Sequence, residues 1–404
     1  MTPIPTQGEP SEITQEGVAA MLSRPIEPLD AVDPVAQLTP DQAFEARLAA
    51  GRPGLRRSLH GHRPVSPAKE LRDLAHEAAG LDASQWDRYG EGGPVRELEQ
   101  AVADALGMPA AAMFPTGVMA QQAALRVWTG RQACRAVALP GLSHLLVHEL
   151  DGPHLLHGFR WCRLSEGAAF PTASDLAAEP SRLGAALLEL PLRDAGFLLP
   201  SWPELVAFSD ACRDRGVPLH LDGARLWEAA ASLERTPAQV SALADSVYVS
   251  LYKGLGGLAG AVLAGPADVV AESRQWRRRQ GGTLPSMVPY AVGGLRGLRQ
   301  QLPRMGEYRQ RALELAEALV ARGVRVYPDP PQATAFRLLA EASQAELDDR
   351  LLRCVEEDRT FVVPRFRRSE VPGWCWTELS VGSATMDWDT VKAADYLAHL
   401  LLDD

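Results

Sequence analysis

Lysine is almost absent from this chain. Among its 41 basic residues only Lys69, Lys253 and Lys392 are lysines, which leaves 38 arginines. The guanidinium group of arginine stays charged, whereas the amine of lysine can lose its proton and attack a carbonyl group. A lysine retained in such a chain is therefore a candidate for chemistry, and an ordinary surface lysine is the alternative.

Other features are also missing. The five cysteines are scattered and contain no CxxC pair, which argues against a disulfide framework or a zinc site. No apolar run approaches the roughly 18–20 residues that span a bilayer, and the first twenty residues lack the parts of a signal peptide. The formal net charge of -10 argues against a nucleic-acid or anionic-membrane surface. These absences predict a cytoplasmic protein with no nucleic-acid or membrane partner and no metal site.

The chain does contain a long alternation of strand and helix patterns. Short apolar runs are expected to form buried parallel strands; they lie at 135–141, 185–192, 217–223, 245–252 and 259–266. Helical patterns separate them, such as the one that stops at Gly216. This alternation is typical of an α/β sheet covered by helices on both faces.

The pattern changes beyond about residue 303, where long helical patterns alternate with isolated strands. We expect a separate small α+β domain there. The first 50 or so residues are Pro-rich and acidic, which indicates a loosely held arm or one short helix. We therefore predict an N-terminal extension over 1–57, a large domain over 58–302 and a small domain over 303–404.

Several polar residues fall at the carboxyl ends of predicted strands, where ligands collect in open α/β sheets. Thr116 and Gly117 precede a helical run. Free backbone N–H groups at a helix start, with a hydroxyl group and a glycine, can form a phosphate cradle, although a plain helix cap is the simpler interpretation. His144 follows the strand over 135–141 and could be structural or could stack on a ring.

The next two strand ends carry opposite charges. Asp222 closes the strand over 217–223, where a buried carboxylate needs a partner, either the nearby Arg225 or a protonated ring nitrogen. Lys253 closes the strand over 245–252. A phosphate cradle, a ring stacker, a carboxylate and an amine in this order are what a pyridoxal phosphate site requires.

These residues carry a family resemblance. The sequence resembles the threonine aldolase and β-eliminating lyase family of fold-type-I pyridoxal phosphate enzymes over roughly 58–400, in "DRYGEGGPVRELEQAVADALG", "FPTGVMAQQAAL", "LSHLLVHE", "HLDGARLWEAA" and "VSLYKGLGGLAGAVLAG". The resemblance implies a transferase-like α/β fold with a mainly parallel seven-stranded sheet covered by helices and a smaller α+β C-terminal domain. It also implies a homodimer or homotetramer with active sites built across the subunit boundary.

The resemblance assigns roles by matching position. Lys253 corresponds to the lysine that binds the cofactor covalently, Asp222 to the partner of the pyridine nitrogen, and His144 to the imidazole that stacks on the ring. Thr116, Gly117 and Val118 correspond to the family's phosphate-binding Ser-Gly-Thr, and Arg225 corresponds to the arginine of its Asp-Gly-Ala-Arg motif. The resemblance therefore implies a cofactor-binding set of Thr116, Gly117, Val118, His144, Asp222, Arg225 and Lys253. Arg225 is also implied to hold the substrate carboxylate.

The residues expected around the substrate depart from the family pattern. Pro191 and Leu192 stand where the family has Thr-His, so the histidine that meets the substrate hydroxyl is absent there. We expect a more apolar wall at this position. Arg193, beside it, could point inward and select an acidic side chain, or could form an ion pair.

Other family positions are changed as well. The N-terminal Arg-Ser-Asp stretch reads "LHGHRP", with His60 and His62. Glu378 or Ser380 stands where a C-terminal arginine completes the carboxylate clamp. The phosphate-binding arginine of the neighbouring subunit has no match, unless one of three arginines substitutes for it: Arg277, Arg278 or Arg279.

The expected function is that of a pyridoxal phosphate-dependent lyase. It would cleave the Cα–Cβ bond of a β-hydroxy-α-amino acid to glycine, or a related amino acid, plus an aldehyde. The expected substrate-binding residues are Arg225, His60, His62 and Arg193, and a base is expected among His60, His62 and His148. The alternatives are β-elimination or another lyase reaction, and a catalytically silent homologue that binds the cofactor.

Overall fold

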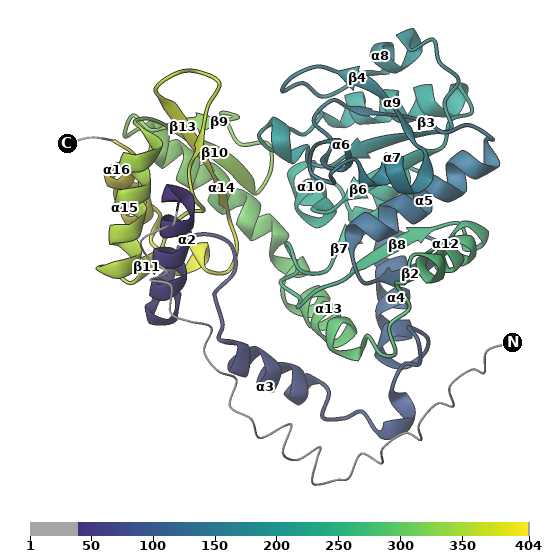
Figure 1. The fold of residues 1–404 in the computed structure, drawn as a ribbon, viewed down its shortest axis with the longest axis horizontal. Helices are drawn as coiled ribbons and strands as arrows, with labels where there is room; N and C mark the ends of the chain where they lie inside the picture. The colour runs from purple at the N-terminus through teal and green to yellow at the C-terminus, as the bar shows by residue number, and fades with distance from the viewer. Residues whose placement is uncertain (1–38, 403–404) are drawn as a thin grey trace, which may run out of the picture. The chain divides into compact units, whose positions relative to one another are not determined.

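The computed structural model describes residues 39–402. It divides into a unit over Met1–Ala49, whose described part holds most of helix α2 (Pro40–Gly51), and a unit over Ala50–Asp404 that contains everything else (Figure 1). Most of the predicted N-terminal extension, 1–57, therefore lies outside the described residues. The boundaries between the three predicted domains stay predictions. No helix within 39–402 combines the length and apolarity that a membrane span requires.

The larger unit is built on a seven-stranded sheet, as predicted. Its strands are β2 (Ala110–Phe114), β3 (Ala136–Pro140), β4 (Arg160–Ser165), β5 (Ala185–Glu189), β6 (Leu219–Gly223), β7 (Ser246–Ser250) and β8 (Ala261–Gly265). They lie in the order β2-β8-β7-β6-β5-β3-β4. Every residue of β3, β5, β6, β7 and β8 is buried, as expected for strands that are covered on both faces.

One strand direction differs from the prediction. The run at 259–266 forms β8, but β8 pairs antiparallel with both β7 and β2, so the prediction of a parallel strand there was wrong. Only residues 251–260 connect β7 to β8, and a parallel crossover needs a dozen or more residues, usually including a helix. The short connection therefore forces the chain to return in the opposite direction. The other neighbouring pairs are parallel.

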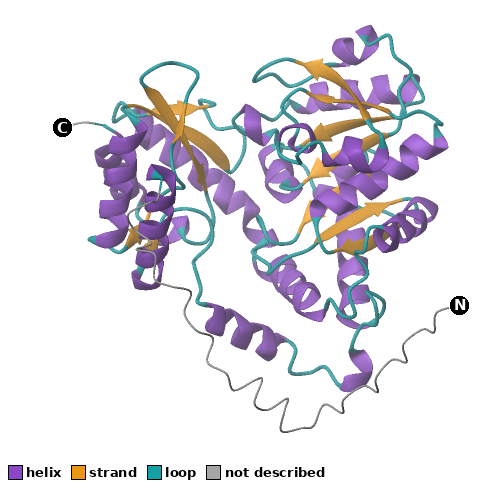
Figure 2. Ribbon diagram, viewed as in Figure 1, coloured by secondary structure: helices purple, strands orange, loops and turns teal. Residues whose placement is uncertain are grey.

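Helices cover the sheet, as Figure 2 shows in purple around the orange strands. The helices of this part of the chain are α3 (Pro67–Glu77), α4 (Gly93–Leu106), α5 (Gly117–Arg131), α6 (His144–Val147), α7 (Gly152–His157), α8 (Ala173–Ala178), α9 (Trp202–Asp214), α10 (Leu226–Ser232), α11 (Pro237–Ser241), α12 (Ala267–Arg279) and α13 (Val288–Gln300). Small apolar residues of α5, such as Ala120 and Ala124, pack on β2 and β8 through Phe114 and Leu263.

The C-terminal part is a small α+β arrangement, as predicted. A four-stranded antiparallel sheet in the order β12-β13-β10-β9 contains β9 (Arg325–Tyr327), β10 (Ala335–Glu341), β12 (Arg367–Arg368) and β13 (Trp374–Ser380). Its helices are α14 (Met305–Val320), α15 (Gln344–Glu356) and α16 (Thr390–Leu401). A short parallel pair joins β1 (Arg57–Ser58) to β11 (Thr360–Phe361), so the chain before α3 pairs with this C-terminal part.

Helix α13 supports the loop that follows β7. A Cβ atom at Gly297 would overlap the carbonyl oxygen of Leu255, and one at Gly293 would lie 3.2 Å from the backbone nitrogen of Leu258. The glycines thus let the loop lie directly against the helix backbone. Because the loop begins at the end of β7, this contact helps to fix Lys253.

We expect Gly297→Ala to lower the free energy of unfolding by about 1–3 kcal/mol, because the added methyl group has no space between α13 and the loop. Gly306→Ala is the matched control in helix α14, where a Cβ atom would meet nothing within 4 Å. That change should be neutral or stabilising by up to about 1 kcal/mol. Urea unfolding of both variants measures the difference, and equal stability of the two would contradict the proposed contact.

Candidate active site

The candidate residues gather at one edge of the sheet. Strands β2, β3, β5, β6 and β7 run in the same direction, so their carboxyl ends meet there (Figure 1). Asp222 in β6 is the direct register partner of Glu189 at the end of β5. Lys253 follows the end of β7, and His144 opens α6 after β3. The topology therefore brings these strand ends together at one edge of the sheet; that they form one site stays a prediction.

Lys253 is a largely buried amine without an ion-pair partner. Burial lowers its pKa, the positive charge of Arg225 lowers it further, and the carboxylates of Asp222 and Glu189 oppose this effect. Among the described residues, no carboxylate oxygen lies within 4 Å of this amine, which is the distance limit for an ion pair. The site thus increases the fraction of neutral, nucleophilic amine, which is the form that attacks a carbonyl group.

Asp222 offers one unpaired carboxylate oxygen. The residue is 2% exposed, and its Oδ1 accepts a hydrogen bond of 3.0 Å from the backbone nitrogen of Ala224. No described residue donates to Oδ2. The structural alternative, an ion pair with Arg225, is not formed; the guanidinium group of Arg225 instead lies 5.3 Å from the centre of the Phe197 ring. A buried carboxylate with a bare oxygen fits a protonated ring nitrogen.

The start of α5 combines a helix cap with free backbone donors. Oγ1 of Thr116 accepts from the backbone nitrogen of Met119 at 3.2 Å, so this residue is the cap of the helix. Gly117 has a packing reason as well, since a Cβ atom there would overlap the hydroxyl group of Tyr248. The N–H groups of Gly117 and Val118 precede the first intrahelical bond and can still bind an anion. The cap and the phosphate cradle are therefore compatible.

His144 is held at both its backbone and its ring. Its backbone nitrogen donates to Oε2 of Glu189 at 2.8 Å, and its Nε2 lies 2.8 Å from Oε1 of Glu149. Burial lowers the pKa of the imidazole; Asp222 opposes this effect, and Lys253 adds to it. The ring thus stays near the charged centre in a fixed orientation.

Glu189, at the end of β5, is a residue of the site that the sequence analysis did not single out. Burial raises its pKa to about 8, and the neighbouring Asp222 adds to this effect. Its two oxygens accept from the backbone nitrogens of His144 at 2.8 Å and Arg193 at 3.1 Å. One carboxyl group therefore ties the segment after β3 to the segment after β5. The only sequence signal was its position at a strand end.

Gly254, which follows Lys253, is enclosed by two side chains. Its carbonyl oxygen accepts from Nε2 of His62 at 2.8 Å, and a Cβ atom at this position would overlap the carboxyl group of Glu228. Glu228 is buried, burial raises its pKa, and its Oε2 has no hydrogen-bond partner. The turn after Lys253 is therefore tightly packed.

Two histidines before α3 reach the site by different contacts. Nδ1 of His62 accepts from the backbone nitrogen of Ser383 at 3.4 Å, and Nε2 is engaged by Gly254, so both ring nitrogens have protein partners. Nδ1 of His60 accepts from the backbone nitrogen of Ser380 at 3.3 Å. Burial lowers the pKa of His60 to about 4, and the charge of nearby Arg225 adds to this effect.

Arg193 does not point freely toward the site. Its Nη2 lies 2.9 Å from Oε2 of Glu378, and its Nε lies 3.1 Å from the same oxygen. Glu378 faces Arg337 across the β10–β13 pair. The structure therefore places Arg193 in an ion pair, the second of the two roles considered for it, and gives no support to its role as a substrate-binding group.

His148 forms a dyad that the sequence did not indicate. Its Nε2 lies 2.6 Å from Oδ2 of Asp194, and its ring centre lies 4.9 Å from that of His144. One ring nitrogen each of His144 and His148 and one carboxylate oxygen of Asp194 lie within 4.8 Å of one another, so the three side chains form one polar cluster.

The three arginines considered for the phosphate differ in exposure. Arg277 is buried and its Nη1 donates to the carbonyl oxygen of Met113 at 2.5 Å, so it makes a structural contact within the chain. Arg278 and Arg279 are exposed, and Arg279 lies over the ring of Trp276.

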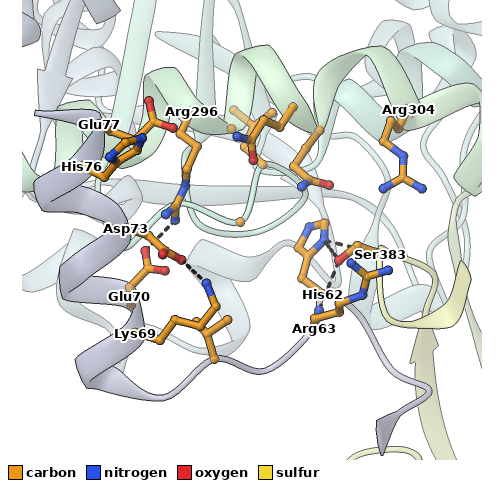
Figure 3. Close-up of a pocket in the computed structure, with 16 residues that line it drawn as sticks. His62, Arg63, Lys69, Glu70, Asp73, His76, Glu77, Arg296, Arg304 and Ser383 are labelled. Carbon is orange, nitrogen blue, oxygen red and sulfur yellow. Dashed lines mark hydrogen bonds and ion pairs between the residues drawn. The ribbon is translucent and has the colours of Figure 1, made fainter. Parts of the chain in front are cut away.

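A cavity of about 610 Å³ lies beside the site rather than in it. It is lined by His62, Ser383 and the loop residues Leu255 and Gly256, together with charged side chains of α3 and α13 (Figure 3). Lys253 and Asp222 do not line it. Its charges largely satisfy one another, for example Lys69 with Asp73 at 2.7 Å.

Known proteins match this chain along most of its length. The Beta-eliminating lyase family model matches residues 66–340. A low specificity L-threonine aldolase of Saccharomyces cerevisiae is 28% identical over 285 residues, 67% of this chain and 70% of that protein. A crystal structure from Exiguobacterium sp. 255-15, named as an aromatic amino acid beta-eliminating lyase/threonine aldolase, is 37% identical, has a TM-score of 0.81 and covers 88% of this chain and 99% of its own. An L-allo-threonine aldolase structure from Listeria monocytogenes EGD-E has 34% identity, a TM-score of 0.81 and coverages of 89% and 99%.

The depressed pKa of His60 predicts a pH dependence of stability. Unfolded, this histidine titrates near 6.5; folded, it titrates at about 4. Between these values the unfolded chain binds a proton that the folded chain does not, so His60 makes the free energy of unfolding decrease as pH falls from 6.5 toward 4. We expect His60→Gln to show a shallower decrease in urea unfolding across this range. Parallel curves for the two proteins would contradict the assignment.

Proposed function

Because the chain belongs to the threonine aldolase and β-eliminating lyase family of fold-type-I pyridoxal phosphate enzymes, we propose that it cleaves the Cα–Cβ bond of β-hydroxy-α-amino acids to glycine, or a related amino acid, and an aldehyde. The observation that carries this proposal is the buried amine of Lys253 beside the bare carboxylate oxygen of Asp222. The relatives named as threonine aldolases support the same carbon–carbon lyase chemistry.

The described residues fit pyridoxal phosphate. Lys253 supplies an amine of lowered pKa to hold the cofactor, and Asp222 can keep a proton on the ring nitrogen through its free Oδ2. The backbone N–H groups at the start of α5 can bind a phosphate group, and the fixed imidazole of His144 can orient the ring. When bound, the cofactor accepts electron density from the broken bond.

Arg225 is the proposed anchor of the substrate carboxylate. Its guanidinium group forms no ion pair with a described residue, although it lies among the charges of the site and lowers the pKa values of His60 and Lys253. An unpaired guanidinium group binds a carboxylate through paired hydrogen bonds. His60, held by Ser380, is proposed to line the same region.

A second copy of the chain is proposed to cover the edge of the site. Leu150, Leu155 and Leu156, which lie shortly after His144 in the chain, are 93%, 74% and 70% exposed, and large apolar side chains exposed in one short segment favour a protein interface there. The five cysteines are free thiols, which supports the proposal of a reducing, cytoplasmic location.

We expect Asp222→Asn to retain part of the bound cofactor but to raise the activation barrier by about 3–5 kcal/mol, because a neutral amide cannot replace the charge that faces the ring nitrogen. The measurement is kcat together with the cofactor content of the purified variant. Asp210→Asn, an exposed change on α9, is the control. Near-normal turnover of Asp222→Asn would contradict the proposed role.

The substrate is tested by comparing threonine, phenylserine and β-hydroxyaspartate under one set of conditions, with both products identified. Leu192 replaces the family histidine, and Arg193 is engaged by Glu378, so we expect phenylserine to have the highest kcat/KM. Burial of its aryl group contributes roughly 25 cal/mol per Å². A clear preference for threonine would contradict the prediction of an apolar wall, and a preference for β-hydroxyaspartate would mean that Arg193 is released from Glu378.

The products identify the type of reaction. Release of ammonia and a keto acid instead of an aldehyde would indicate β-elimination, and absence of any turnover would indicate a silent homologue.

A further inference from the structure

The proposed cleavage needs a base for the β-hydroxyl proton, and the family histidine that meets this hydroxyl is replaced by Leu192. This inference rests on the proposed function and concerns which side chain of this chain does that work. Three histidines near the strand ends are candidates: His60, His62 and His148. A base needs a ring nitrogen with a free lone pair that a substrate can reach.

Contacts within the protein disfavour two of them. His62 uses Nδ1 to accept from Ser383 and Nε2 to donate to Gly254, so neither nitrogen is free. His60 accepts a hydrogen bond from Ser380 at Nδ1 and lies beside the positive charge of Arg225. A cation next to the ring opposes the uptake of a proton.

His148 has the arrangement of a base. The carboxylate of Asp194 can only accept a hydrogen bond, so the 2.6 Å contact places the ring proton on Nε2. Nδ1 then carries a lone pair, and no described residue donates to it. The side chain of His148 is 29% exposed and its ring lies 4.9 Å from that of His144, which borders the charged centre.

The two segments that carry this dyad are tied together by one carboxyl group. Glu189 binds the backbone nitrogen of His144, one helical turn before His148, and also binds the backbone nitrogen of Arg193, next to Asp194. Arg337 donates to the carbonyl oxygen of Asp194 at 2.7 Å. A buried carboxyl group thus sets the spacing between the segments that carry the histidine and the carboxylate.

We propose that His148 is the catalytic base that takes the β-hydroxyl proton, and that Asp194 is the residue that positions it. The proton passes from the hydroxyl oxygen to Nδ1, and the electrons of the O–H bond form the carbonyl group of the aldehyde. The electron pair of the broken Cα–Cβ bond stays with Cα, which takes up a proton to give glycine. The proton lost at oxygen balances the one gained at carbon, so no further reactant is needed.

The test compares His148→Gln and Asp194→Asn with His76→Gln, an exposed histidine of α3, as the control. With the best β-hydroxy amino acid of the panel, we expect kcat of His148→Gln to fall about 10²–10⁴-fold. The dissociation constant of glycine, a product that lacks the β-hydroxyl group, should change less than threefold. A kcat within threefold of the wild type, or an equal loss of glycine binding, would overturn the proposal.

Asp194→Asn tests the positioning role by a readout that does not depend on turnover. An amide can donate to Nε2, which would move the ring proton to Nδ1, the wrong atom for the base. We expect the ¹⁵N chemical shifts of His148, measured on folded protein without cofactor, to show a proton on Nε2 in the wild type and on Nδ1 in the variant. The same tautomer in both proteins, or a proton on Nδ1 in the wild type, would overturn this part of the proposal.

The outcomes separate this inference from the proposed function. If the wild type cleaves no member of the panel, the proposed function fails whatever the tautomer of His148. If the wild type cleaves and His148→Gln cleaves equally well, the function stands and the base is another group.

Discussion

The electrostatic interaction between the largely buried amine of Lys253 and the buried carboxylate of Asp222 is the constraint around which the site is organised. The two groups influence each other without forming an ion pair, and Arg225 adds a second cation that has no acidic partner within ion-pair distance among the described residues. Such an arrangement costs free energy in the protein alone. It becomes favourable when a ligand supplies a carbonyl group, a protonated ring nitrogen and anionic groups, which is the chemistry of a bound pyridoxal phosphate and an amino acid.

The rest of the fold holds these groups in place. Parallel strands bring Asp222 and Glu189 into register, and the backbone of α13 supports the loop after Lys253. His62 joins that loop to Ser383 near the end of the chain. A change in any of these supports would therefore move the amine relative to the carboxylate.

Much of this could be predicted from the sequence, because the signals are local. Buried strands followed by Asp222 and Lys253 are visible as apolar runs with a polar end, and the family motifs cover the same stretches. The direction of β8 was missed because strand patterns carry no direction, and only the short connection after β7 reveals it. The contacts of His62 with Ser383 and of His148 with Asp194 join residues far apart in sequence, so no spacing rule could find them. Glu189 was visible as a strand-end acid, but its two backbone contacts depend on how the loops fold.

The central claim is that Lys253 is the amine that binds the cofactor, and reductive trapping tests it most directly. Purified protein loaded with pyridoxal phosphate is treated with borohydride and digested, and the labelled peptide is located by mass spectrometry. The account predicts one label, on Lys253, and none on Lys69, which is exposed and paired with Asp73. A label on Lys69 or Lys392, or no retained cofactor, would contradict the account.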